Sequence, residues 1–137
     1  DLKNRLKLMK DYPNAVFVSV HLNKFTTSAA NGSQVFYGSK NDESQKLGQS
    51  IQTSIVNLLQ KDNKRVIKKA TSSTYLLYNA TIPAVIVECG FLTNPQEAKL
   101  LCDEEYQQKT AWAIHLGILQ YLNSGGKQSD EMDENTH

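Results

Sequence analysis

Two side chains suited to acid–base or metal chemistry stand directly after short apolar runs. Glu88 follows the run 84–87, and His21 follows the run 15–20. Both runs are apolar at successive positions, which is typical of strands buried on both faces in a mostly parallel sheet. The carboxyl ends of parallel strands open into one crevice, where ligands bind in open α/β folds. We therefore expect the imidazole and the carboxylate to lie together.

The position of Glu88 suggests its chemistry. A carboxylate at the end of a buried strand is partly desolvated, which raises its pKa and suits it to act as a general acid or base near neutral pH. A glutamate taken alone at a strand end more often caps a helix or pairs with a lysine. The second strand of the same design, which delivers His21, favours the catalytic interpretation.

Other candidate ligands have ordinary structural interpretations. Cys89 is predicted to be a small core residue, and with Cys102 it lacks the Cys-x-x-Cys spacing of common zinc sites. His115 is predicted to flank a helix, and His137 lies in a polar terminal segment.

The remaining pattern predicts an α/β domain with helices on both faces of the sheet. Apolar spacing predicts helices over 1–10, 42–60 and 104–122, and further strands over 34–37 and 75–78. The segment 61–69, with five lysines or arginines, is predicted to be a solvated loop. A short helix is predicted to begin at Thr93-Asn94-Pro95, with Asn94 or Thr93 as N-cap, Pro95 at the first helical position and Glu97 completing a capping box with Asn94.

Composition limits the classes of function. The chain has 137 residues, which suits one domain, and we assign it to residues 1–123, followed by a disordered polar and acidic tail over 124–137. The formal charge of +1 and the presence of only two arginines argue against nucleic acid as a partner. No apolar run approaches the ~20 residues of a membrane span.

The strand-end motifs resemble those of a known family. Val-Ser-Val-His21-Leu-Asn and Pro-Ala-Val-Ile-Val-Glu88-Cys-Gly-Phe-Leu-Thr-Asn-Pro are similar to motifs of the zinc-dependent N-acetylmuramoyl-L-alanine amidases. Such enzymes hydrolyse the amide between muramic acid and L-alanine of the peptidoglycan stem. The resemblance implies that His21 is a Zn²⁺ ligand and Glu88 the catalytic carboxylate. His-Leu-Asn, and the lack of a wall-binding repeat, resemble the sporulation and germination branch.

The resemblance also implies a substrate, a place of action and further site residues. The substrate would be peptidoglycan, and the place of action extracytoplasmic, in the cell wall or spore cortex. Asn23 would hold the adjoining loop or contact substrate, and the polar segment 26–31 would rim the crevice. Glu88 would take a proton from the attacking water and pass it to the leaving nitrogen.

The chain departs from the family at its beginning. Members start with a strand that supplies a zinc-binding histidine, and a glutamate ligand follows on the next helix; neither is present here. We therefore expect the printed chain to be the C-terminal portion of an amidase domain that lacks its N-terminal strands. Alone, it should bind zinc weakly, be inactive, and expose apolar surface over 16–20 or 85–87.

Two alternatives remain open. The chain could be a non-catalytic peptidoglycan-binding or partner-binding remnant of the same fold. It could also belong to a different zinc hydrolase, such as a peptidase with convergent strand-end ligands.

Overall fold

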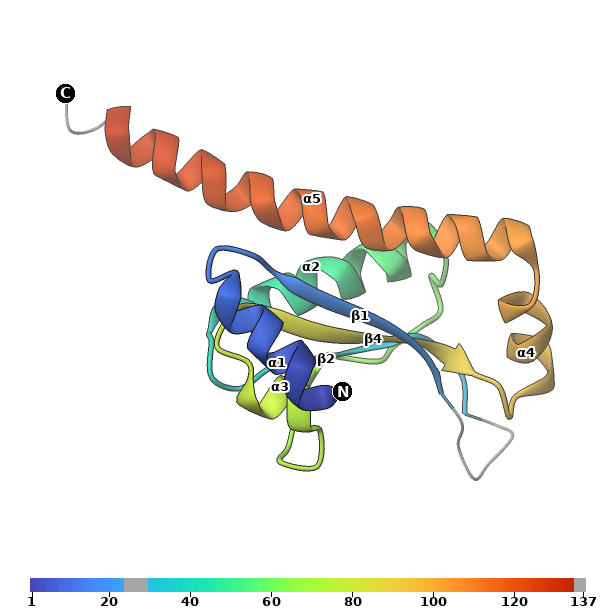
Figure 1. Ribbon diagram of the computed structural model, residues 1–137. Coiled ribbons are helices and arrows are strands. Elements are labelled where there is room, and N and C mark those ends of the chain that lie inside the picture. Colours follow the sequence, from blue (N-terminus) through green and yellow to red (C-terminus); the bar gives the residue numbers. More distant parts are fainter. Residues whose placement is uncertain (24–29, 135–137) are drawn as a thin grey trace.

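A four-stranded sheet forms the centre of the molecule (Figure 1). The computed structural model describes residues 1–23 and 30–134. Strand β1 (Phe17–Asn23) pairs in parallel with β4 (Ala84–Phe91), and β4 pairs antiparallel with β2 (Gln34–Tyr37). Strand β3 (Lys68–Lys69) pairs in parallel with β2. Helices cover both faces, so the predicted α/β class with a largely parallel sheet is confirmed.

Helices α2 (Glu43–Leu58) and α5 (Glu104–Glu134) cover one face of the sheet (Figure 1). Leu47, Ile51 and Ile55 recur every four residues along α2, so they lie on one side of the helix, and all three are fully buried. They pack in one apolar cluster with side chains of α5 and with three fully buried side chains of the sheet, Val35, Val85 and Val87. Burial of such side chains stabilises the fold by roughly 1.5–3 kcal/mol each.

The two helices approach each other closely where α5 carries a glycine. A Cβ placed on Gly117 would lie 2.7 Å from the Ile51 Cα atom. Two serines of α2 use this proximity, because Ser50 Oγ donates to the Gly117 carbonyl and Ser54 Oγ donates to the Ala113 carbonyl, each at 2.6 Å. The apolar faces of α2 and α5 alone do not specify how closely the two helices pack. The glycine and the two serines do.

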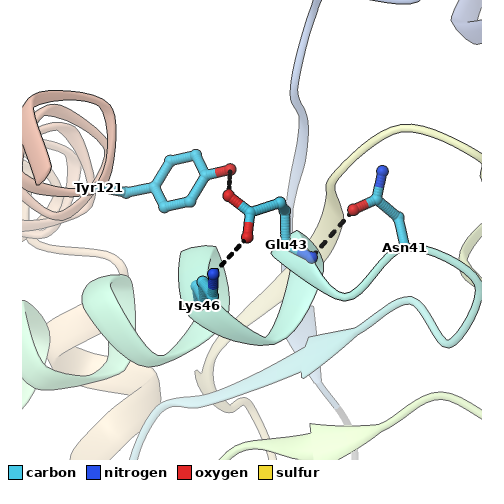
Figure 2. A network of polar contacts seen from close by, with 4 residues as sticks. All are labelled: Asn41, Glu43, Lys46 and Tyr121. Carbon is cyan, nitrogen blue, oxygen red and sulfur yellow. Dashed lines mark hydrogen bonds and ion pairs between the residues drawn. The ribbon is translucent and has the colours of Figure 1, made fainter. Parts of the chain in front are cut away.

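A polar contact joins the middle of α5 to the first turn of α2 (Figure 2). The Tyr121 hydroxyl donates to Glu43 Oε1 at 3.1 Å, while Lys46 Nζ lies 2.8 Å from Glu43 Oε2. The hydrogen bond and charge of Lys46 lower the pKa of Glu43, although burial opposes the shift. Asn41 Oδ1 accepts from the Glu43 backbone N–H and so orders the start of the helix.

The opposite face of the sheet is covered by helices at one end only (Figure 1). Helices α1 (Leu2–Asp11) and α3 (Tyr75–Asn79) pack there, with Met9 and Leu77 buried against Ala84 at the beginning of β4. No helix among the described residues covers the carboxyl-terminal half of β1 and β4 on this face. Helix α4 (Pro95–Leu101) follows β4 around the end of the sheet.

Several elements differ from the sequence-based expectation. Residues 75–78, predicted to be a strand, form helix α3. This helix buries the adjacent Leu76 and Leu77 in the apolar cluster that also contains Met9 and Ala84, and hydrophobic periodicity does not distinguish a helix from a strand in so short a run. The predicted basic loop contains β3, whose lysine side chains stay exposed while the backbone pairs. Glu88 and His21 lie within their strands, which are longer than predicted.

Helix α5 also continues to Glu134, through part of the segment predicted to be a disordered tail. A helix that is already formed gains one hydrogen bond for each added residue, so a polar extension needs no apolar periodicity. No helix among the described residues is long and apolar enough to cross a membrane.

We predict that Gly117→Ala destabilises the protein by about 1–3 kcal/mol, because the added methyl group overlaps the α2 backbone. Gly125→Ala is the matched control on the same helix, since its Cβ would meet nothing within 4 Å. That change should be neutral or stabilise by up to about 1 kcal/mol through helix propensity. Urea unfolding followed by circular dichroism measures both, and equal effects would contradict the close-packing argument.

We also predict that the chain as printed self-associates through β1. Within the described residues this strand pairs only with β4, and Val20 and Leu22 are 56% and 50% exposed. The alternative expectation, exposure of 85–87, is wrong for Val85 and Val87, which are fully buried.

Light scattering after size exclusion should show that Val20→Lys reduces this association, because a charge on an edge strand opposes pairing between sheets. Leu58→Lys is the control, because Leu58 is 53% exposed on α2, away from that edge. A monomeric wild-type chain would contradict the prediction.

Candidate active site

Three polar side chains form a row across the half of the sheet that none of the described helices covers. His21 on β1 pairs directly with Glu88 on β4, and Glu88 pairs directly with Gln34 on β2. Directly paired residues project from the same face of a sheet, with neighbouring strands about 4.8 Å apart. The structure therefore places the predicted imidazole and carboxylate side by side, and it adds an amide that the sequence analysis did not identify.

Glu88 is half-buried and incompletely paired. Its Oε2 atom is buried and has no hydrogen-bond partner within the described part of the chain. Burial raises the pKa of this carboxyl, while the nearby His21 partly offsets the rise. Buried polar atoms are normally hydrogen-bonded, so an orphan oxygen in this position is unusual for a purely structural residue.

His21 is exposed, and its ring lies on the same face as Ser19. The distance between His21 Nε2 and Ser19 Oγ is 2.9 Å. The serine fixes the orientation of the ring, as outer partners of functional histidines commonly do. The side chain remains accessible from the open face, as a ligand or proton carrier must be.

Asn23 ends strand β1 beside a local irregularity of the pairing. The register shifts between His21 and Asn23, so that Asn23 pairs with Phe91. The Asn23 carbonyl accepts from the Leu92 backbone N–H at 2.8 Å and ties the two strand ends together. This bond is consistent with the loop-holding role. Substrate contact by Asn23 remains a prediction, and most of the predicted rim over 26–31 lies outside the described residues.

Helix α4 holds the chain segment 30–32 that leads into β2. Both carboxylate oxygens of Glu97 accept from the Gly32 backbone N–H, at 2.9 and 3.1 Å, and Oε1 also accepts from Phe91 N–H at 3.0 Å. Asn94 caps the helix as predicted, and its Nδ2 atom donates to the Ala30 carbonyl. The predicted return hydrogen bond of the capping box, from the Asn94 backbone N–H to Glu97, is wrong. The Glu97 carboxylate accepts from the backbone N–H groups of Gly32 and Phe91 instead.

Gly32 occupies a position that requires glycine. Its φ of +89° lies in the left-handed region, and a Cβ there would lie 3.1 Å from the Asn63 side chain. The segment 30–32 is thus held between helix α4 and the loop after α2.

Arg65, in the loop predicted to be merely solvated, reaches this segment and the row of site residues. Its Nε donates to the Asn31 carbonyl at 2.7 Å, and Nη1 donates to Gln34 Oε1 at 3.2 Å. Its guanidinium lies 4.8 Å from the centre of the Phe91 ring, within cation–π distance. Sequence patterns give no signal for this contact, because the partners of Arg65 come from two segments, 31–34 and Phe91, that are both distant from it in the sequence.

The described residues do not complete a zinc site. A catalytic zinc takes three protein ligands, and no group of three or more His, Cys, Asp or Glu gathers among residues 1–23 and 30–134. Cys89 is buried on the other face of the sheet, where burial raises its pKa to about 11. Cys102 is exposed, and His115 lies beside Trp112 in an apolar groove between α5 and β1.

The fold and the site together define a class: an open α/β domain with a half-buried carboxylate and an imidazole on adjacent parallel strands. Residues 1–120 match the family model described as N-acetylmuramoyl-L-alanine amidase. The chain belongs to this family of hydrolases.

Relatives with known names support this assignment. The chain is 36% identical over 126 residues to the germination-specific N-acetylmuramoyl-L-alanine amidase of Bacillus subtilis, covering 92% of this chain and 52% of that protein. It is 34% identical to the amidase LytC of the same species, covering 77% of this chain and 21% of that protein. The chain thus spans about half of the first relative and a smaller part of the second.

Solved structures show the same fold. The CwlD amidase from Clostridioides difficile, in complex with the GerS lipoprotein, superposes with a TM-score of 0.83 at 43% identity. That match covers 90% of this chain and 62% of the other. The amidase AmiC2 of Nostoc punctiforme gives a TM-score of 0.80 at 29% identity, covering 90% and 66% of the two chains.

We predict that Glu88→Gln raises the melting temperature of the chain as printed near neutral pH. The folded-state pKa of Glu88 is raised, so its ionisation costs stability as the pH rises through the window between the unfolded and folded pKa values. The neutral amide removes that cost. The advantage should shrink at pH values below the usual carboxyl range, where Glu88 is protonated. Calorimetric melts measure it, and a lower melting temperature at neutral pH would contradict the prediction.

Proposed function

We propose that the whole protein of which this chain forms part hydrolyses the amide between N-acetylmuramic acid and L-alanine of peptidoglycan. The observation that carries the proposal is the direct pairing of His21 with Glu88, whose buried Oε2 atom has no hydrogen-bond partner among residues 1–23 and 30–134. Membership of the amidase family and the motif around Glu88 support the same activity.

Glu88 is the general base in this proposal. It takes the proton of a water molecule as the oxygen attacks the amide carbon, and then delivers that proton to the leaving nitrogen as the C–N bond breaks. The raised pKa of this carboxyl suits both transfers near neutral pH. Its unpartnered oxygen needs no hydrogen bond to be broken before it accepts the proton.

We further propose that the whole protein is zinc-dependent and that His21 is one ligand. A bound zinc ion would supply Lewis-acid polarisation and a more acidic water. The exposed His21 ring is available for such a role, and the remaining ligands, a histidine and a glutamate, would come from residues outside this chain. Asn23, at the end of the same strand, is proposed to hold the adjoining loop beside the substrate.

The names of relatives suggest finer assignments. One relative is called germination-specific, which favours spore cortex as the substrate and an extracytoplasmic place of action. A solved relative forms a complex with a lipoprotein, which supports a protein partner for the whole protein here as well.

The deciding experiment uses the whole protein of which this chain forms part, called the longer protein below, and compares it with its Glu88→Gln variant on purified peptidoglycan. Wild type should release intact stem peptides with a free L-alanine amino group. The variant should lose at least about 100-fold in rate, as expected for loss of a general base. Mass spectrometry of the products separates an amidase from a peptidase, which would cut within the stems. An inactive wild type would instead favour a non-catalytic binding role.

Zinc binding provides the control. Calorimetric titration should show tight binding to the longer protein and to its Glu88→Gln variant, and weak binding to the chain as printed, because a single imidazole gives little affinity. Submicromolar affinity in the printed chain would show that the metal site has been misplaced.

A further inference from the structure

Arg65 lies beside the site, and the proposed hydrolysis gives it no role. Its Nη1 atom donates to Gln34 Oε1 at 3.2 Å, and Gln34 pairs directly with Glu88. The guanidinium is therefore hydrogen-bonded to the residue that lies directly beside the catalytic Glu88 on the neighbouring strand. It lies on the side of Glu88 opposite to His21, because β4 runs between β1 and β2.

The position of Arg65 is fixed by its surroundings. Its backbone N–H donates to Asn63 Oδ1 at 2.8 Å, its Nε to the Asn31 carbonyl at 2.7 Å, and its cation lies 4.8 Å from the Phe91 ring centre. The acceptor at Asn31 is itself held, because the flanking Ala30 and Gly32 are bound by helix α4. A guanidinium ordered in this way loses little conformational entropy when it binds a ligand.

Arg65 also has unused binding capacity. A guanidinium carries five N–H donors, of which Arg65 uses two within the described residues, and its planar shape matches the geometry of a carboxylate. Within residues 1–23 and 30–134, no aspartate or glutamate forms an ion pair with it. The structure thus holds a half-buried, rigid and unneutralised cation at the edge of the site.

We propose that Arg65 binds a free carboxylate of the substrate on the peptide side of the cleaved amide. The inference rests on the proposed amidase function and adds a determinant of specificity to it. The lactyl carboxyl is consumed in the amide and N-acetyl sugars are neutral, so the free carboxylates belong to the stem peptide. An extended peptide advances about 3.3–3.6 Å per residue. A stem that leaves Glu88 across β2 therefore reaches Arg65 within its first few residues.

The test uses two soluble muramoyl peptides that differ only in whether the stem carboxylates are free or amidated. The longer protein should prefer the free acid. Arg65→Gln should reduce kcat/KM for the free acid by about tenfold or more, mainly through KM, and leave the amidated substrate within about twofold. The kcat/KM of Arg65→Lys for the free acid should lie between those of wild type and Arg65→Gln, because lysine keeps the positive charge but lacks the planar guanidinium that binds a carboxylate with two hydrogen bonds.

Lys64→Gln is the matched control, since it removes one positive charge from the neighbouring, exposed position. It should change both substrates equally and by little. Equal losses on both substrates for Arg65→Gln, or no loss on either, would overturn the proposal. If Arg65→Gln fails to fold in a thermal melt, the comparison of the two substrates with Arg65→Lys decides the matter.

Binding in the Glu88→Gln background separates this inference from the activity. Calorimetry with the same two peptides should show that Arg65→Gln weakens binding of the free acid alone. Arg65-dependent binding by a wild-type protein that cleaves nothing would refute the amidase and retain the carboxylate site. Cleavage without discrimination between the peptides would retain the amidase and refute the role of Arg65.

Discussion

The parallel pairing of β1 with β4 is the constraint on which the site depends. It places His21 opposite Glu88 although 66 residues of chain separate them in the sequence. A slip of one residue would turn one of the two side chains to the other face of the sheet. The register is held by the hydrophobic pattern, because Val85 and Val87 are buried beneath α2 and α5 on one face while Glu88 faces the other.

The two faces of the sheet are used differently, and this division explains how a stable core coexists with an open site. The face beneath α2 and α5 carries the larger apolar cluster, and the helix contacts across Gly117 keep that layer compact. Among the described residues, helices cover the other face only at the amino end of β4 (Figure 1). The other half retains a partly desolvated carboxylate, one oxygen of which has no hydrogen-bond partner in the described part of the chain. This is a local cost in stability of the kind that functional sites carry.

Helix α4 connects strand β4 to its surroundings. The Glu97 carboxylate binds backbone donors from the end of β4 and from Gly32, so one side chain joins segments distant in sequence. Because the same short helix holds Ala30 through Asn94, the segment entering β2 is fixed on both sides of Asn31. Arg65 then uses the Asn31 carbonyl as its own anchor. The geometry around the proposed substrate path is thus set by hydrogen bonds among backbone groups rather than by apolar packing.

The sequence by itself determined the α/β class, the central strands, the capped start of α4 and the proximity of His21 to Glu88, although the structure places both residues within their strands rather than after them. These features follow from local patterns: apolar runs, a proline after an asparagine, and polar residues directly after buried strands. The tertiary structure alone decided that 75–78 is helical, that Glu97 binds Gly32, and that Arg65 reaches Gln34. Each of these depends on contacts between segments far apart in the chain, and no local period encodes which distant partner a side chain will meet.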